Sequence, residues 1–148
     1  MHIRRSGSLE IPLPPREALA LFTAEGEREW VPGWDPVYLH TEGAPTEEGT
    51  VFRTEHDGQE TVWLILRWEP GDGVARYGRF TPGHRVGTVE VRCDPRPSGG
   101  SRVTVTYALT ALSEEDAQDL ETLTPEAYRA MMVEWQERLM DLVEGEAS

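Results

Sequence analysis

The chain has 148 residues, with 14 Arg, no Lys and 27 acidic residues, and its formal net charge is −13. A chain of this length is expected to fold as one domain over residues 1–148, with a core that needs neither metal nor disulfide. The negative charge argues against nucleic acids and anionic membrane surfaces as partners, because both would be repelled.

The N-terminal sequence MHIRRSGSLE lacks the apolar segment of a signal peptide. No stretch approaches the roughly 18 apolar residues of a membrane-spanning helix. We therefore expect a cytoplasmic protein without membrane insertion. Cys93 is the only cysteine and lies in a Val-rich run, which is typical of a small buried residue rather than a nucleophile.

Residues 2–11 alternate polar with apolar side chains and predict a first strand, which the following prolines end. Residues 16–23 carry apolar side chains at helical spacing and predict a short helix. Residues 24–36 contain Gly26 and the pair Pro32-Gly33, so we expect a bent segment with a second short helix.

From residue 37 to residue 112, short strand-like runs alternate with turn signals, of which Asp57-Gly58 is a strong hairpin signal. The connections are short, so successive strands are expected to pair as antiparallel neighbours. The expected strands cover residues 37–41, 50–56, 60–68, 74–80, 85–93 and 102–112.

The run at residues 62–68 has bulky apolar side chains on both faces. In regular alternation, Val62, Leu64, Leu66 and Trp68 share one face, and Trp63 and Ile65 share the other. Such a strand is either covered on both sides or packs its outer face on another subunit. A chain this short has few residues left to bury the second face of the strand, so a homodimer through this strand is one expectation.

The clearest periodicity lies in residues 124–143, where Thr124 suits the cap and Pro125 the first helical position. About 20 residues at about 1.5 Å each give a helix of about 30 Å, which needs a broad apolar surface to pack on. A shorter helix is expected to begin at Ser113. One stripe of the long helix comprises Tyr128, Met131, Met132, Trp135, Leu139, Leu142 and Val143.

This order of elements resembles the START-like superfamily, also called the helix-grip or SRPBCC fold. Its members include birch-pollen-allergen-like and polyketide cyclase/dehydrase-type proteins. The resemblance spans nearly the whole chain and rests on LEIPLPPREALALFTAEGEREWVPGW, EGTVFRTEHDGQETVWLILRWEP, YGRFTPG, VTVTYALTALSEE and the terminal helix with Trp135. It implies an α+β fold in which a curved antiparallel sheet of about seven strands wraps around the long C-terminal helix, with two short helices after the first strand.

The resemblance also implies a cavity between the sheet and the long helix, closed by the short helices. An empty cavity of about 300 Å³ would cost about 7 kcal/mol, so it should hold water or a ligand unless aromatic side chains fill it. Each candidate for the ligand-binding wall has a plain structural alternative. For Arg79 it is a position on the solvent side of the sheet, for Trp30 and Trp34 it is packing of the short helices on the sheet, and for the others it is the core. The candidates are Trp30, Trp34, Phe52, Trp63, Tyr77, Arg79, Tyr107, Tyr128, Met131, Met132 and Trp135.

No catalytic or metal-binding signature is present. His2, His40, His56 and His84 are scattered, and neither HExxH, GxSxG nor a phosphate-binding glycine motif occurs. We therefore predict no metal and no cofactor. The acidic side chains around Gly26 are expected to form a solvated surface.

The favoured function is binding or carriage of a small apolar ligand, such as a lipid, a sterol or a polyketide-like molecule. Two alternatives stay open. One is a cyclase, aromatase or dehydratase in which Tyr77, Arg79, Tyr107 and His84 act on a carbonyl compound. The other is a protein-interaction or regulatory module, similar to a co-chaperone or a toxin–antitoxin partner.

Overall fold

The computed structural model describes residues 1–147, with side chains described through Gly145. The chain forms seven strands and four helices within these residues. The strands are β1 (His2–Ile11), β2 (Val37–His40), β3 (Val51–His56), β4 (Gln59–Glu69), β5 (Val74–Thr81), β6 (Arg85–Pro95) and β7 (Ser101–Ala111). The helices are α1 (Pro15–Ala20), α2 (Ala24–Glu27), α3 (Glu114–Glu121) and α4 (Pro125–Ala147).

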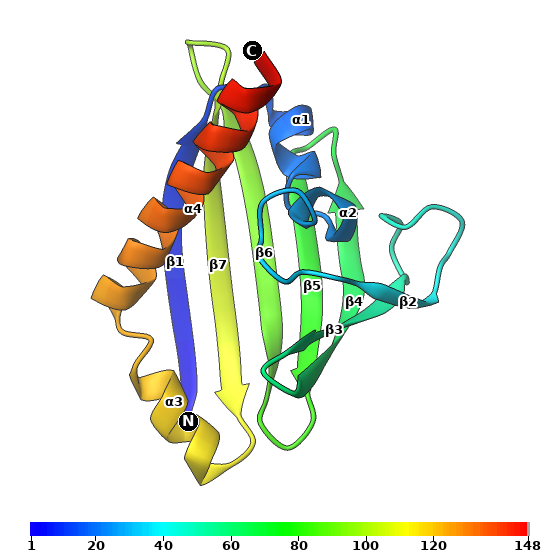
Figure 1. Ribbon diagram of the computed structural model, residues 1–148, viewed down its shortest axis with the longest axis vertical. Coiled ribbons are helices and arrows are strands. Elements are labelled where there is room, and N and C mark those ends of the chain that lie inside the picture. Colours follow the sequence, from blue (N-terminus) through cyan, green and yellow to red (C-terminus); the bar gives the residue numbers. More distant parts are fainter. Residues whose placement is uncertain (148) are drawn as a thin grey trace.

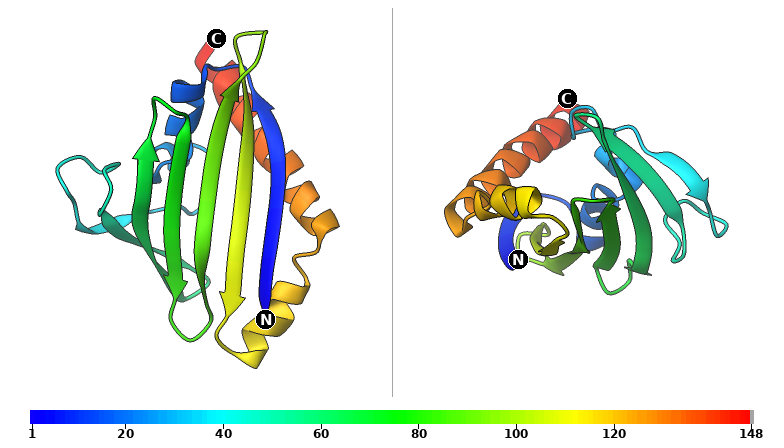
Figure 2. Two further views of the ribbon diagram at one scale, coloured as in Figure 1. Left: turned by 180° about the vertical axis from the view of Figure 1, so that it is seen from behind. Right: turned by 90° about the horizontal axis from the view of Figure 1, so that it is seen from below.

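All strands belong to one antiparallel sheet in the order β1-β7-β6-β5-β4-β3-β2. The six strands from β2 to β7 form the predicted meander, and the first strand joins its far side by pairing with β7. The sheet curves around the helices (Figures 1 and 2). Both the helix-grip architecture and the order of elements predicted from the sequence are confirmed.

The long helix α4 crosses the concave face of the sheet diagonally, in front of β1 and β7 (Figure 1). Thr124 caps it as predicted, because the Ala127 N–H donates to the Thr124 hydroxyl at 3.1 Å. Its inner stripe is buried, and Tyr128, Met132 and Leu139 are each at most 2% exposed. The helix therefore forms one wall of the core.

The short helices α1 and α2 cover another part of the concave face, where α1 packs against β6 and β7 (Figure 1). Ala18 and Leu19 of α1 are fully buried, and Trp30, just after α2, is 6% exposed. The convex face of the sheet carries none of α1, α2 and α4 (Figure 2). Cys93 is 2% exposed, as its Val-rich surroundings predicted.

Strand β4 departs from the regular alternation expected of residues 62–68. Its register with β5 shifts between Ile65 and Arg67, so Leu66 is an extra residue on that strand. Trp68 consequently packs against the core, whereas Leu64 and Leu66 remain 40% and 43% exposed on the outer face. The prediction that Trp68 shares a face with these leucines was wrong, because the bulge reverses the alternation.

Candidate functional site: an aromatic cavity beneath α2

One interior cavity lies where the sheet, α2 and α4 meet, and its volume is about 40 Å³. That space holds about two or three water molecules and is far below the roughly 300 Å³ of a small ligand site. Its walls are the residues Phe22, Ala24, Glu27, Trp34, Phe52, Trp63, Tyr77, Val89, Val91, Val105, Tyr107 and Trp135.

Two groups of aromatic rings form most of the cavity walls. On the side of β3 and β4, the rings of Phe52 and Trp63 stack with centroids 5.9 Å apart and planes 7° apart. Trp34 meets Trp63 edge-on at 5.8 Å, and its indole N–H donates to the Ala24 carbonyl at 2.8 Å. Because Trp34 is only half-buried, it separates the cavity from solvent on this side.

The second group lies against α4. Trp135 contacts Phe22, Trp30 and Tyr107, with ring centroids 6.4, 5.5 and 6.4 Å away. Trp135 and Tyr107 thus touch directly, and this end of the helix stripe is packed core. The free space lies between this group and the Trp34, Phe52 and Trp63 group.

Glu27 brings a carboxyl group into this apolar space. It is the last residue of α2 and lies one turn after Ala24, so both residues face the cavity. Gly26 permits the close approach of α2 to α1, since a Cβ at that position would lie 2.0 Å from the Ala20 carbonyl oxygen. Desolvation raises the pKa of the Glu27 carboxyl well above its ordinary value, so burial favours the protonated form of this group.

Polar contacts on the outer side fix α2 in place. Arg28 forms ion pairs with Glu25 at 3.1 Å and Asp35 at 3.0 Å, and also donates to the Pro36 carbonyl at 3.0 Å. The Tyr38 hydroxyl from β2 donates to the Glu25 carboxylate. Acidic residues on the two faces of this short helix therefore differ: the pKa of Glu25 on the surface is lowered, chiefly by the Tyr38 hydrogen bond, and the pKa of Glu27 at the cavity is raised by burial.

Two tyrosines share the cavity with Glu27. The Tyr77 hydroxyl donates to the Phe22 carbonyl at 3.0 Å, so its hydrogen bond is already used. The Tyr107 hydroxyl has no hydrogen-bond partner among residues 1–147. Desolvation, opposed in part by the nearby Arg79 guanidinium, raises the pKa of Tyr107 to about 12, so this hydroxyl stays a proton donor.

Arg79 points to the concave side of β5, not to solvent. Its guanidinium lies over the Trp63 ring, with Cζ 5.0 Å from the centroid, in the geometry of a cation–π contact. Its Nε is buried and has no acceptor among the described residues. Burial lowers the pKa of this guanidinium from its ordinary value, and the cation sits one ring away from the cavity.

The candidates chosen from the sequence therefore divide into three sets. Six line the cavity: Trp34, Phe52, Trp63, Tyr77, Tyr107 and Trp135. Trp30 and Arg79 support lining residues from behind. Tyr128, Met131 and Met132 do not line it, and the Tyr128 hydroxyl instead donates to the Val105 carbonyl at 2.6 Å.

Sequence reasoning missed Glu27, which was expected in a solvated surface. The signal was present in the spacing, because Ala24, Glu27 and Trp30 follow one another at intervals of three on a helical turn. The other residues missed in the wall are Phe22, Ala24, Val89, Val91 and Val105.

Within the described part of the chain, no three His, Cys, Asp or Glu side chains gather in a way that would hold a metal ion. None of the described helices is long and apolar enough to cross a membrane.

Comparisons with known proteins agree with the fold. Norcoclaurine synthase from Thalictrum flavum, in a truncated form, superposes with a TM-score of 0.67 at 10% identity, covering 94% of this chain and 93% of that one. Ara h 8.0201 superposes with a TM-score of 0.60 at 16% identity, over 82% of this chain and 89% of that one. At these identities the likeness shows the fold alone.

A third structure, DynU16, described as a putative protein in the dynemicin biosynthetic locus, gives a TM-score of 0.65 at 17% identity. It covers 95% of this chain and 47% of that one. Among curated proteins, none is significantly similar in sequence to this chain. The family model described as "Polyketide cyclase / dehydrase and lipid transport" matches residues 2–143, and the chain therefore belongs to this family, within the START-like superfamily.

Proposed function

We propose that this protein binds a small, mainly apolar molecule with a planar aromatic ring system and at least one oxygen substituent, in the cavity beneath α2. The observation that carries the proposal is the pairing of aromatic walls with two unused polar groups, the Glu27 carboxyl and the Tyr107 hydroxyl. Ligand sites combine apolar walls with a few such groups that fix orientation.

The aromatic walls favour a flat ring system over a long acyl chain. The rings around the cavity meet at edge-on and stacked angles, and a further ring that entered between them would contact Trp34, Trp63 and Trp135. The cavity must widen for any such ligand, because about 40 Å³ holds only water. Trp34 is the wall residue best placed to move, since it is half-exposed and follows the short helix α2.

The test is calorimetric titration of the full chain with 2-naphthol, naphthalene, palmitate and cholesterol. We expect 2-naphthol to bind more tightly than naphthalene by about tenfold, the worth of one good buried hydrogen bond. Glu27→Gln with Tyr107→Phe should reduce this preference. Tyr128→Phe should not, because Tyr128 does not line the cavity and its hydroxyl already donates to the Val105 carbonyl. Binding of palmitate alone, or of none of the four, would overturn the proposal.

A second candidate function is acid–base catalysis in the same cavity. The observation that favours it is that the Glu27 carboxyl, whose pKa burial raises, lines the same cavity as the Tyr107 hydroxyl, since a carboxylic acid that keeps its proton can give it to a carbonyl oxygen. The family description names cyclases and dehydrases. In that case Glu27→Gln removes turnover of a bound carbonyl compound and leaves its binding within about twofold.

A further inference from the structure

The free edge of β1 is long, and neither a proline nor a bulge interrupts it. Natural edges are shortened, bulged or broken by proline, because unpaired backbone groups recruit other strands. The opposite edge follows that rule: β2 has four residues and a register shift between Tyr38 and His40. By contrast, β1 has ten residues, contains no proline and pairs with β7 without a register shift.

Among the residues whose side chains are described, hydrogen bonds from side chains occupy this edge at its two ends. The Glu10 N–H donates to the Gln136 Oε1 from α4 at 2.9 Å, and the Arg4 carbonyl accepts from the Arg5 guanidinium at 2.9 Å. Alternate residues of a strand present their backbone groups to the same side. Ser6 and Ser8 therefore direct N–H and C=O groups outward along with Glu10.

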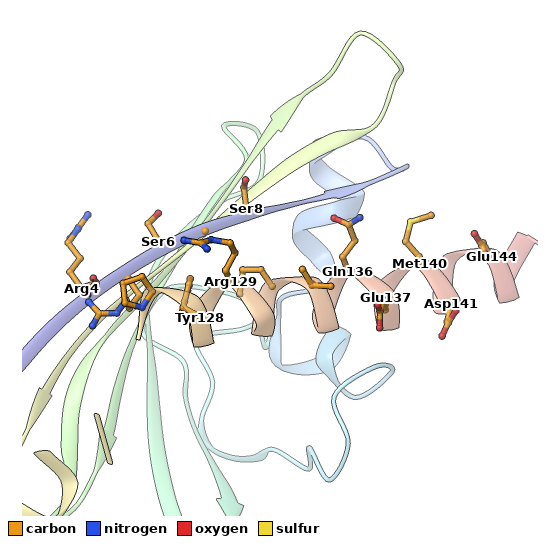
Figure 3. A pocket seen from close by; sticks show the side chains of 15 residues that line it. Arg4, Ser6, Ser8, Tyr128, Arg129, Gln136, Glu137, Met140, Asp141 and Glu144 are labelled. Atoms are coloured by element: carbon orange, nitrogen blue, oxygen red, sulfur yellow. Dashed lines mark hydrogen bonds between the residues drawn. The ribbon is translucent and has the colours of Figure 1, made fainter. Parts of the chain in front are cut away.

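A groove of about 780 Å³ runs along this edge, between β1 and α4. Figure 3 shows Ser6 and Ser8 projecting from β1, with Gln136 and Met140 projecting from α4 on the same side. Val133 also lines the groove and is 57% exposed, although it lies near the middle of a helix whose inner stripe is buried. An apolar side chain and free strand groups thus occupy one exposed site.

The two ends of the groove carry opposite charges. Its first half contains Arg4, Arg5 and Arg129, and its second half contains Glu137, Asp141 and Glu144. On α4 the opposite charges lie at equal distances from Val133, because Arg129 is four residues before it and Glu137 four residues after it. A two-fold rotation through the centre of the groove would bring each basic half onto an acidic half.

We infer that this groove is the interface of a symmetric dimer, in which β1 of a second copy pairs antiparallel with β1 and extends the sheet across both subunits. Ser6 and Ser8 of each copy supply the central strand hydrogen bonds, and Val133 meets its counterpart near the axis. Arg129 of one copy faces Glu137 of the other. This isologous geometry is the commonest arrangement of homo-oligomers.

A second copy fits the groove better than an unrelated extended peptide. A basic peptide is repelled by the Arg4, Arg5 and Arg129 half, and an acidic peptide by the other half. A second copy of this chain places its acidic residues against the basic half of the groove and its basic residues against the acidic half. The inference is independent of any ligand in the interior cavity, because Tyr128 and Met132 separate that cavity's wall from the groove.

Charge reversal in analytical ultracentrifugation tests the inference. At about 150 mM salt, where long-range repulsion between negative chains is screened, we expect a dimer with a micromolar dissociation constant. Arg129→Glu and Glu137→Arg should each weaken it by about tenfold or more, and the double variant should recover most of the loss. Glu55→Arg, an exposed change on β3, is the matched control and should have no effect.

Cross-linking tests which surface of the protein forms the dimer interface. Cys93 is buried, so Ser6→Cys offers the only accessible thiol, and a short bifunctional maleimide should link two copies through it. Leu64→Cys places the thiol on the exposed outer face of β4 and should give no covalent dimer. A chain that stays monomeric at about 200 µM, or one that cross-links through Leu64→Cys and not Ser6→Cys, would overturn the inference.

Discussion

The guanidinium of Arg79 lies over the indole of Trp63, with Cζ 5.0 Å from the ring centroid, while its Nε is buried without an acceptor in the described chain. The cation–π contact recovers about 0.5–2 kcal/mol, and we expect the desolvated guanidinium, with its buried Nε lacking an acceptor, to cost more. We predict that Arg79→Met leaves the free energy of unfolding unchanged or raises it by about 1 kcal/mol.

Urea unfolding followed by circular dichroism checks this prediction. Arg76→Met changes an exposed arginine of the same strand and should shift stability by less than about 0.5 kcal/mol. A loss of more than about 1 kcal/mol in Arg79→Met would show that the cation is structural, and would weaken the case that it is retained for a ligand.

Glu27 should make stability depend on pH in a particular direction. The folded-state pKa is raised above the ordinary value of 4.5, so the unfolded chain loses this proton first as pH rises. Stability is therefore highest below about pH 4.5 as far as this group is concerned, and it falls by about 1.4 kcal/mol per pH unit until the folded-state pKa is reached.

Glu27→Gln removes the titratable carboxyl and hence its contribution to the pH dependence of the free energy of unfolding. The variant should equal the wild type near pH 4.5 and become progressively more stable than it as the pH rises above 4.5, as measured by urea unfolding at a series of pH values. Glu29→Gln, at an exposed position, should track the wild type. A difference that does not change with pH would mean that the Glu27 carboxyl is ionised in the folded protein.

Trp34→Ala should open the cavity beneath α2 to solvent and make it able to accept an external ring. Removing this half-buried indole is expected to cost about 2–4 kcal/mol. Free indole at about 1 mM should restore part of this loss as a rise in unfolding temperature. Trp68→Ala, which removes an indole that does not line the cavity, should gain nothing from indole. Equal responses of the two variants would contradict the prediction.

Gly26→Ala should displace α2. The new Cβ would lie 2.0 Å from the Ala20 carbonyl oxygen, and backbone cannot yield as a side chain does. We expect a loss of about 2 kcal/mol or more in thermal unfolding, together with a lower folded-state pKa of Glu27 as water reaches its carboxyl. Gly71→Ala is the control, since the nearest atom to its Cβ would be an Arg16 side-chain nitrogen at 3.8 Å. Stability like that of the control would show that α2 adjusts freely.

The sequence predicted the fold well because its signals are local. Proline and glycine mark the strand ends, Thr124 and Pro125 mark the start of α4, and both kinds of signal act within a few residues. The bulge at Leu66 was missed, since nothing in an unbroken apolar run shows which residue is extra. That one residue decides whether Trp68 faces the core or the outside.

The residues that line the cavity were predicted only in part. Alternation along β3, β4, β5 and β7 identified the inward aromatic residues, but it does not give the width of the space between layers. Tyr128 and Met132 face inward as predicted and meet Gly7 of β1, where a Cβ would lie 2.9 Å from Met132 Cγ. Glu27 was missed because a single helical turn between a glycine and an arginine looks polar in composition, and only its contacts show that it faces inward.

The gathering of indoles around the cavity gives the protein a built-in optical reporter. Four of its five tryptophans, Trp30, Trp34, Trp63 and Trp135, line or directly contact the wall of this space. Their emission therefore depends mainly on the polarity and occupancy of the cavity rather than on the protein surface. An aromatic ligand in the cavity would quench this tryptophan fluorescence, so its binding could be followed on the unlabelled chain at concentrations too low for calorimetry.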